Sequence, residues 1–128
     1  MEINEKIKSS IKSGLKVILC IGETEEEKQM LKKDIVIKRQ IRNALVNVDN
    51  INNVIIAYEP VWSIGTNNIP DNDELIKTIK YIKQLVFNMY NKDINVIYGG
   101  SINEKNIDKI KTIEEIDGYL IGSASINP

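Results

Sequence analysis

Residues 54–60 read VIIAYEP, five apolar or aromatic residues in succession followed by a glutamate held in front of a proline. The run does not alternate with polar residues, which is typical of a parallel strand buried on both faces. Because Pro60 disfavours helical backbone in the preceding residue, Glu59 is expected to be extended. The stretch therefore predicts a buried strand that presents a carboxylate at its carboxyl end.

Three more continuous apolar runs have the same form, at residues 16–22 (KVILCIG), 94–98 (INVIY) and 118–122 (GYLIG). Between them lie stretches with the apolar spacing of amphipathic helices. The expected helices are residues 1–13, a helix from Asp34 to about Val48, a helix opening at Asp71, and a short one around Ile107 and Ile110. Alternation of this kind predicts an α/β fold with parallel strands and right-handed helical crossovers. An open doubly wound sheet and part of a barrel both remain possible.

Helix boundaries follow from capping residues. Gly14 is a plausible stop for the first helix, Asp34 is expected to cap the second, and Asp71 with Glu74 resembles an acidic capping box for the third. Residues 24–33 are polar and charged, and residues 48–53 are expected to form a loop. The residues expected to face inward from the second and third helices are Ile37, Ile41, Leu45 and Val48, then Leu75, Ile79, Ile82, Val86 and Met89.

The composition describes one ordinary globular domain over residues 1–128, with 42% hydrophobic and 27% charged residues and a net charge of −1. This charge balance lacks the excess of positive charge that binding to nucleic acid or to an acidic membrane surface requires. No apolar stretch is long enough to span a bilayer, and the first residues do not form a secretory signal. The single cysteine, Cys20, favours an intracellular setting. There is no histidine, the usual general acid or base near neutral pH.

The chemistry is concentrated where the strands end. These ends carry Gly22-Glu23, Glu59-Pro60, Gly99-Gly100-Ser101 and Gly122-Ser123, and ligands of parallel α/β folds bind at this edge. Two glycine turns before helices suggest a shared phosphate site. Taken one at a time, each feature has a simpler explanation. The glycines can be tight turns, Glu23 a structural residue that holds a loop, Cys20 a small core residue, and Trp62 a packing residue.

The order of these motifs resembles the triosephosphate isomerase family. VILCIGET resembles the family's fifth strand and loop, AYEPVWSIGT its sixth strand and lid, VIYGGSINEKN its seventh strand and phosphate loop, and DGYLIGSAS its eighth strand. The resemblance covers essentially the whole chain. It implies a (β/α)8 barrel of which only about half, four parallel strands with helices, is present, since such a barrel needs about 250 residues.

The resemblance also implies roles. Glu59 would be the catalytic base that interconverts glyceraldehyde 3-phosphate and dihydroxyacetone phosphate, and Tyr98 would support the closed lid. Members of this family pair such a glutamate base with a closing loop that excludes water. The lid would comprise Pro60, Val61, Trp62, Ser63, Ile64, Gly65 and Thr66, and the phosphate would be bound by Gly65, Ser101, Gly122 and Ser123. No metal or organic cofactor is implied.

The chain departs from the family in several places. It resembles only the C-terminal half, so the asparagine and lysine after the first strand and the histidine after the fourth would come from elsewhere. Ser123 stands where the family often has glycine, and residues 67–70 (NNIP) replace the usual lid exit. The partner is expected to be an N-terminal half-barrel or a second copy, with a homodimer once the barrel is complete.

The expected function is thus a cytoplasmic isomerase of glycolysis and gluconeogenesis, inactive unless an N-terminal half completes it. One alternative is a non-catalytic phosphate-binding half-barrel or a relic. A weaker one is another phosphate-binding barrel enzyme, because Gly-Gly-Ser turns are widespread in such barrels, although AYEPVWSIGT argues against it.

Overall fold

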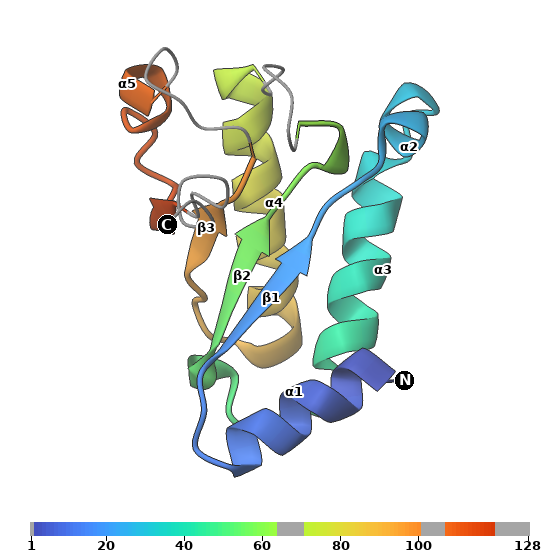
Figure 1. Ribbon diagram of the computed structural model, residues 1–128, viewed down its shortest axis with the longest axis vertical. Helices are drawn as coiled ribbons and strands as arrows, with labels where there is room; N and C mark the ends of the chain where they lie inside the picture. Colours follow the sequence, from blue (N-terminus) through green and yellow to red (C-terminus); the bar gives the residue numbers. More distant parts are fainter. Residues whose placement is uncertain (1, 64–70, 101–106, 120–128) are drawn as a thin grey trace, which may run out of the picture.

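A computed structural model of the chain describes residues 2–63, 71–100 and 107–119. Its four strands form one parallel sheet in the order β1-β2-β3-β4, with a helical crossover between successive strands (Figure 1). The expected α/β architecture is confirmed. The strands are β1 (Val17–Ile21), β2 (Val54–Tyr58), β3 (Val96–Tyr98) and β4 (Gly118–Tyr119), and the helices are α1 (Glu2–Lys12), α2 (Glu25–Gln29), α3 (Lys33–Leu45), α4 (Asn72–Tyr90) and α5 (Ile107–Ile110).

The core lies between the sheet and the helices α3 and α4. It includes Ile37 and Ile41 of α3, Ile79 and Ile82 of α4, and Ile56 of β2, all with no measurable exposure. These helix residues repeat at intervals of three and four, which places them on one helical face. The inward-facing residues expected from the sequence are confirmed except Met89, which is 36% exposed. In the last turn of α4 it is Tyr90 that packs against the core instead.

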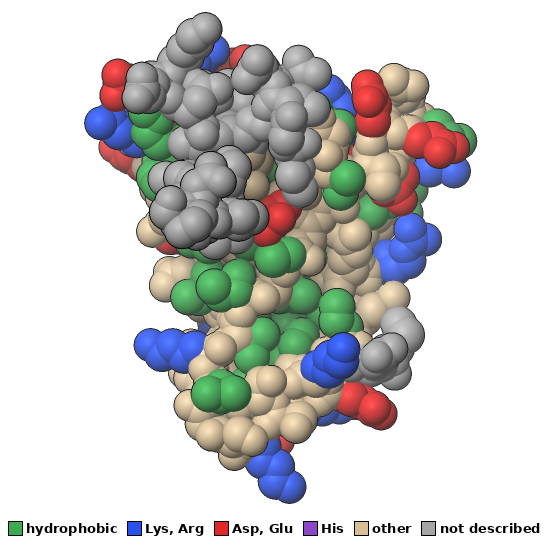
Figure 2. Space-filling view, viewed as in Figure 1, with side chains coloured by type: hydrophobic (Ala, Val, Ile, Leu, Met, Phe, Trp, Pro, Cys, Tyr) green, Lys and Arg blue, Asp and Glu red, His purple; other side chains and the backbone are tan. Residues whose placement is uncertain are grey.

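The opposite face of the sheet is open at β1 among the described residues. In β1, Leu19 and Ile21 are buried whereas Ile18 and Cys20 are exposed, so the two faces of the strand differ. Figure 2 shows hydrophobic side chains gathered over this face. The expectation that this run is buried on both faces is therefore wrong for β1, and so is the interpretation of Cys20 as a core residue.

The helix caps also differ from expectation. Leu31 adopts positive φ and the Lys32 amide donates to the Glu27 carbonyl at 2.9 Å, so α3 begins at Lys33 and Asp34 lies inside its first turn. Asp71 occupies the N-cap of α4, but its side chain makes no capping bond. Glu74 instead pairs with Lys33 at 3.1 Å and joins α4 to α3.

Two connections contain unexpected structure. The segment at residues 24–33 holds α2, which has a complete capping box between Thr24 and Glu27, and residues 51–53 form a 3-10 turn. Gly14 follows α1 with φ of +83°, as a C-terminal stop requires. None of the described helices has both the length and the apolar character needed to cross a membrane.

Polar side chains fasten the end of α3. The Asn4 amide of α1, buried to 6% exposure, donates to the carbonyls of Ala44 at 2.7 Å and Val46 at 2.9 Å. Tyr90 of α4 accepts from the Val48 amide at 2.9 Å and donates to the Leu45 carbonyl. Carbonyls at a helix end lack helical partners, so these two side chains fix where α3 stops, earlier than the sequence indicated.

We expect Asn4→Ala to lower the free energy of unfolding by about 1–3 kcal/mol, because two carbonyls at the end of α3 lose their donor. Urea denaturation measures the change. Asn88→Ala is the matched control, since Asn88 is exposed and its side chain bonds Gln84 within the same helix, α4. Equal stability of the two variants would contradict this account of the α1–α3 junction.

Candidate active site

Two acidic residues lie at the carboxyl ends of adjacent strands. Glu23 follows β1 by two residues, and Glu59 directly follows β2. The strands are in register with Ile21 opposite Tyr58, so the parallel ladder brings both carboxylates to the same edge of the sheet. This edge is the usual ligand side of a parallel α/β fold.

The backbone around Glu59 is held by the chain that leaves β1. The Glu59 amide donates to the Ile21 carbonyl at 2.7 Å, and the Val61 amide donates to the Glu23 carbonyl at 3.0 Å. Between these bonds Gly22 lies against Glu59 so closely that a Cβ on Gly22 would be 1.9 Å from the Glu59 carbonyl oxygen. Only glycine, which lacks a Cβ, fits at this close crossing of the two backbones. The position of the Glu59 backbone therefore depends on glycine at residue 22.

A second glycine fits against the Glu59 side chain. The Gly99 amide, at the end of β3, donates to the Tyr58 carbonyl at 2.9 Å. A Cβ on Gly99 would lie 2.6 Å from Cγ of Glu59 and 3.1 Å from its carboxyl carbon. The carboxylate thus extends across the end of β3 toward the Gly99-Gly100 turn that the sequence singled out.

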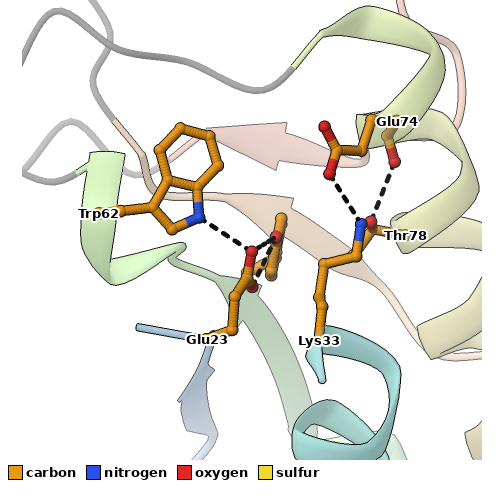
Figure 3. Close-up of polar contacts among 6 residues, drawn as sticks. Glu23, Lys33, Trp62, Glu74 and Thr78 are labelled. Carbon is orange, nitrogen blue, oxygen red and sulfur yellow. Dashed lines mark hydrogen bonds and ion pairs between the residues drawn. The ribbon is translucent and has the colours of Figure 1, made fainter. Parts of the chain in front are cut away.

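Glu23 is completely buried, and its carboxylate is occupied by donors. The Tyr58 hydroxyl donates to Oε1 at 2.8 Å and to Oε2 at 3.0 Å, and Nε1 of Trp62 donates to Oε2 at 2.9 Å (Figure 3). Burial and then the Glu23 carboxylate raise the pKa of Tyr58 far above its usual range, so the hydroxyl stays a donor. This geometry supports the structural role expected of Glu23.

Trp62 lies at the start of the segment after Glu59. Besides its bond to Glu23, its ring faces the Lys28 ammonium of α2, with 3.7 Å between Nζ and the ring centroid. A cation over an indole contributes about 0.5–1 kcal/mol at an exposed site. Trp62 is therefore more than a packing residue, because it links residues 61–63 to both the exit of β1 and α2.

Cys20 faces Glu59 across the two strands. Although the residue as a whole is exposed, partial burial of the thiol, then a hydrogen bond to Glu59 and the charge of that carboxylate, raise its pKa to about 12. A thiol with a raised pKa is a poor nucleophile at neutral pH. Cys20 therefore serves as a neighbour and donor of Glu59 here.

The remaining predicted site residues divide into two groups. Pro60 is buried, Val61 is 50% exposed, and Ser63 ends the 3-10 turn that contains Trp62. Tyr98 is fully buried, with its ring centroid 6.5 Å from that of Tyr58. The predicted residues Ile64, Gly65, Thr66, Ser101, Gly122 and Ser123 lie outside the described part of the chain.

One residue beside the site was missed from the sequence. Gln40 of α3 accepts from the Gly22 amide at 3.0 Å through Oε1 and donates to the Gly22 carbonyl at 3.1 Å through Nε2. A polar residue on an amphipathic helix normally indicates a solvated face, and no local motif marks a contact 18 positions away in sequence.

The arrangement offers a half-buried carboxylate on a fixed backbone, next to a glycine turn and a protonated thiol. Such a carboxylate can act as a general base. Within the described ranges, no three His, Cys, Asp or Glu side chains lie together as a metal centre would require.

Sequence comparison relates the chain to a known family. The family model described as triosephosphate isomerase matches residues 1–128. Triosephosphate isomerases of Thermodesulfovibrio yellowstonii and Trichodesmium erythraeum are each 40% identical to the chain and cover 98% of it, and that of Dictyoglomus thermophilum is 38% identical over 98%. The chain in turn covers 52%, 51% and 53% of those three proteins respectively, and so spans about half their length.

We expect the two glycines that contact Glu59 to respond differently to alanine. Gly22→Ala places Cβ against fixed backbone and should cost about 1–3 kcal/mol of unfolding free energy. In Gly99→Ala the atoms nearest to the new Cβ belong to the Glu59 side chain, which can rotate away, so the substitution should cost less than about 1 kcal/mol. Urea denaturation of both variants measures the difference. A larger loss for Gly99→Ala would show that the Gly22 crossing is not the tighter constraint.

Proposed function

This chain belongs to the triosephosphate isomerase family, and we propose that it supplies the catalytic base, the lid and the phosphate-binding loops of that enzyme. In this proposal it interconverts glyceraldehyde 3-phosphate and dihydroxyacetone phosphate once the rest of the barrel is present. The observation that carries the proposal is the placement of Glu59. Its backbone is held by hydrogen bonds to the residues that follow β1, and its side chain lies against Gly99 at the end of β3.

Glu59 acts as the base. Its carboxylate removes a proton from the substrate carbon next to the carbonyl and leaves an enediolate. The hydroxyl proton passes to the former carbonyl oxygen, and the protonated Glu59 then returns its proton to the carbon that carried the carbonyl. The carbonyl moves by one carbon without net oxidation, so the step needs no redox partner. A fixed backbone keeps the carboxylate within reach of both carbons, which is the orientation that efficient proton transfer requires.

The lid comprises residues 60–66, and its first turn is anchored. Pro60 is buried and stiffens the exit from Glu59. Trp62 is bonded to the buried Glu23 carboxylate and lies under Lys28. We propose that the lid moves about this anchored start, with Tyr98 supporting its closed form, and that closure excludes water from the enediolate.

The substrate phosphate binds to backbone amides of the glycine turns. In this proposal the donors are Gly65, Ser101, Gly122 and Ser123, with Gly99 and Gly100 leading into the second loop. Backbone N–H groups in such turns suit a phosphate because they concentrate donors without adding side chains.

The chain is proposed to be the C-terminal half of the barrel, strands five to eight. Because it contains no histidine, the electrophile that polarises the carbonyl comes from an N-terminal half. Ile18, at 51% exposure, and the other apolar residues on the open face of the sheet are where that half packs. Without it, a second copy covers this face, and the completed enzyme is a cytoplasmic homodimer of glycolysis and gluconeogenesis.

The absence of histidine also favours a second candidate function for the chain by itself. A half-barrel that keeps its phosphate loops but lacks the electrophile can bind a triose phosphate without turning it over. This candidate predicts binding of the substrate without isomerisation, whatever is added.

We expect isomerase activity when the chain is mixed with a separately produced N-terminal half, and at least a hundredfold loss of kcat for Glu59→Gln, as is typical when a general base is removed. Conversion of glyceraldehyde 3-phosphate measures both. Glu26→Gln is the matched control, because Glu26 is an exposed carboxylate on α2. Full activity of Glu59→Gln would refute the assignment of the base, and an inactive mixture that still binds substrate would favour the second candidate.

A further inference from the structure

The side-chain amide of Gln40 makes two hydrogen bonds to Gly22, one to the peptide group before it and one to the peptide group after it. It accepts from the Gly22 amide at 3.0 Å and donates to the Gly22 carbonyl at 3.1 Å. We propose that Gln40 is a positioning residue for the base, acting on Glu59 through the backbone of Gly22. This inference rests on the proposed function of Glu59 as the base.

Gly22 needs a partner from outside the sheet. The ladder between β1 and β2 ends with Ile21 opposite Tyr58, so Gly22 lies one residue beyond the paired strand. Gly22 is buried, and a buried peptide group without a partner costs about 1–3 kcal/mol. A carboxamide is suited to this place because it carries a donor and an acceptor side by side in one plane.

Gln40 is itself fixed. It lies on α3 between Ile37 and Ile41, both without measurable exposure. The first turn of α3 is tied to α4 by the Lys33–Glu74 ion pair at 3.1 Å. The Gln40 amide therefore extends from a packed helix, and its two hydrogen bonds hold Gly22 at a fixed place relative to that helix.

Gly22 in turn positions Glu59. The carbonyls on either side of it, those of Ile21 and Glu23, accept from the amides of Glu59 and Val61 at 2.7 and 3.0 Å. A Cβ on Gly22 would lie 1.9 Å from the Glu59 carbonyl oxygen, which shows how closely the two backbones meet. If the two hydrogen bonds from Gln40 are lost, Gly22 can shift and the Glu59 backbone is held less firmly. Every group that touches Glu59 nevertheless remains in place.

Cys20 gives a direct readout of where Glu59 lies. It is the only cysteine in the chain, it is exposed, and its thiol bonds Glu59. Because the carboxylate suppresses the thiolate, Glu59→Gln should speed alkylation of Cys20 by iodoacetamide about fivefold at a pH below about 10. This acceleration measures the contact between the two side chains, and it requires neither substrate nor activity.

The test is a double-mutant cycle on the 128-residue chain, at a dilution that keeps it monomeric so that Cys20 stays exposed. In the Gln40→Met background, which keeps the side-chain length and removes both hydrogen bonds, we expect Glu59→Gln to speed alkylation by less than about twofold. Gln84→Met is the matched control, since Gln84 is an exposed residue of α4, and it should leave the fivefold effect intact. The same acceleration in the Gln40→Met chain as in the unmodified chain would overturn the proposal.

Activity separates this inference from the proposed function. In the chain completed by an N-terminal half, we expect Gln40→Met to lower kcat about tenfold and leave KM unchanged, because Gln40 affects the base and touches no substrate. A raised KM with unchanged kcat would contradict the positioning role. If the completed chain is inactive, the alkylation cycle still decides whether Gln40 positions Glu59, because that measurement does not depend on turnover.

Discussion

The close crossing of Gly22 over the Glu59 carbonyl is the constraint on which the arrangement of the strand ends depends. A single carbon added to Gly22 would lie 1.9 Å from the Glu59 carbonyl oxygen. The crossing brings the carbonyls of Ile21 and Glu23 to the amides of Glu59 and Val61. From there the direction of the Glu59 side chain and the position of residues 61–63 both follow. The core beneath, from α3 and α4, holds the two strands in the register that makes the crossing possible.

The two carboxylates at this edge have different surroundings, and these surroundings fit different roles. Glu23 is buried and accepts three hydrogen-bond contacts from Tyr58 and Trp62, so it can hold the chain but cannot approach a substrate. Glu59 is half-buried, with a glycine on one side and a thiol of raised pKa on the other. A carboxylate that is only half-buried is suited to receive and return a proton.

Much of the fold could be predicted from local patterns. Continuous apolar runs marked the strands, and residues such as Ile37, Ile41 and Ile79 marked the buried faces of the helices, because burial imposes the period of each element. The cap at Asp34 was wrong, since the turn at Leu31 starts α3 at Lys33. Asp71 does occupy the N-cap of α4, but the expected capping box is absent and Glu74 pairs with Lys33 instead. The site was predictable only in part. The positions of Glu59 and Glu23 at neighbouring strand ends followed from the parallel order, and the role of Glu59 came from the family resemblance. Gln40 could not be found, because its contact with Gly22 depends on how α3 packs on the sheet. The exposure of Cys20 was missed because a continuous apolar run does not reveal that one face of β1 lacks a cover in the described structure.

Amide hydrogen exchange of Glu59 and Val61 tests the central claim most directly, namely that the chain leaving β1 fixes the backbone of Glu59. If the bonds to Ile21 and Glu23 are as rigid as the crossing implies, both amides should exchange only through global unfolding, at the rate of the core strand β2. Exchange of these amides as fast as in an exposed loop, while β2 stays protected, would contradict the account.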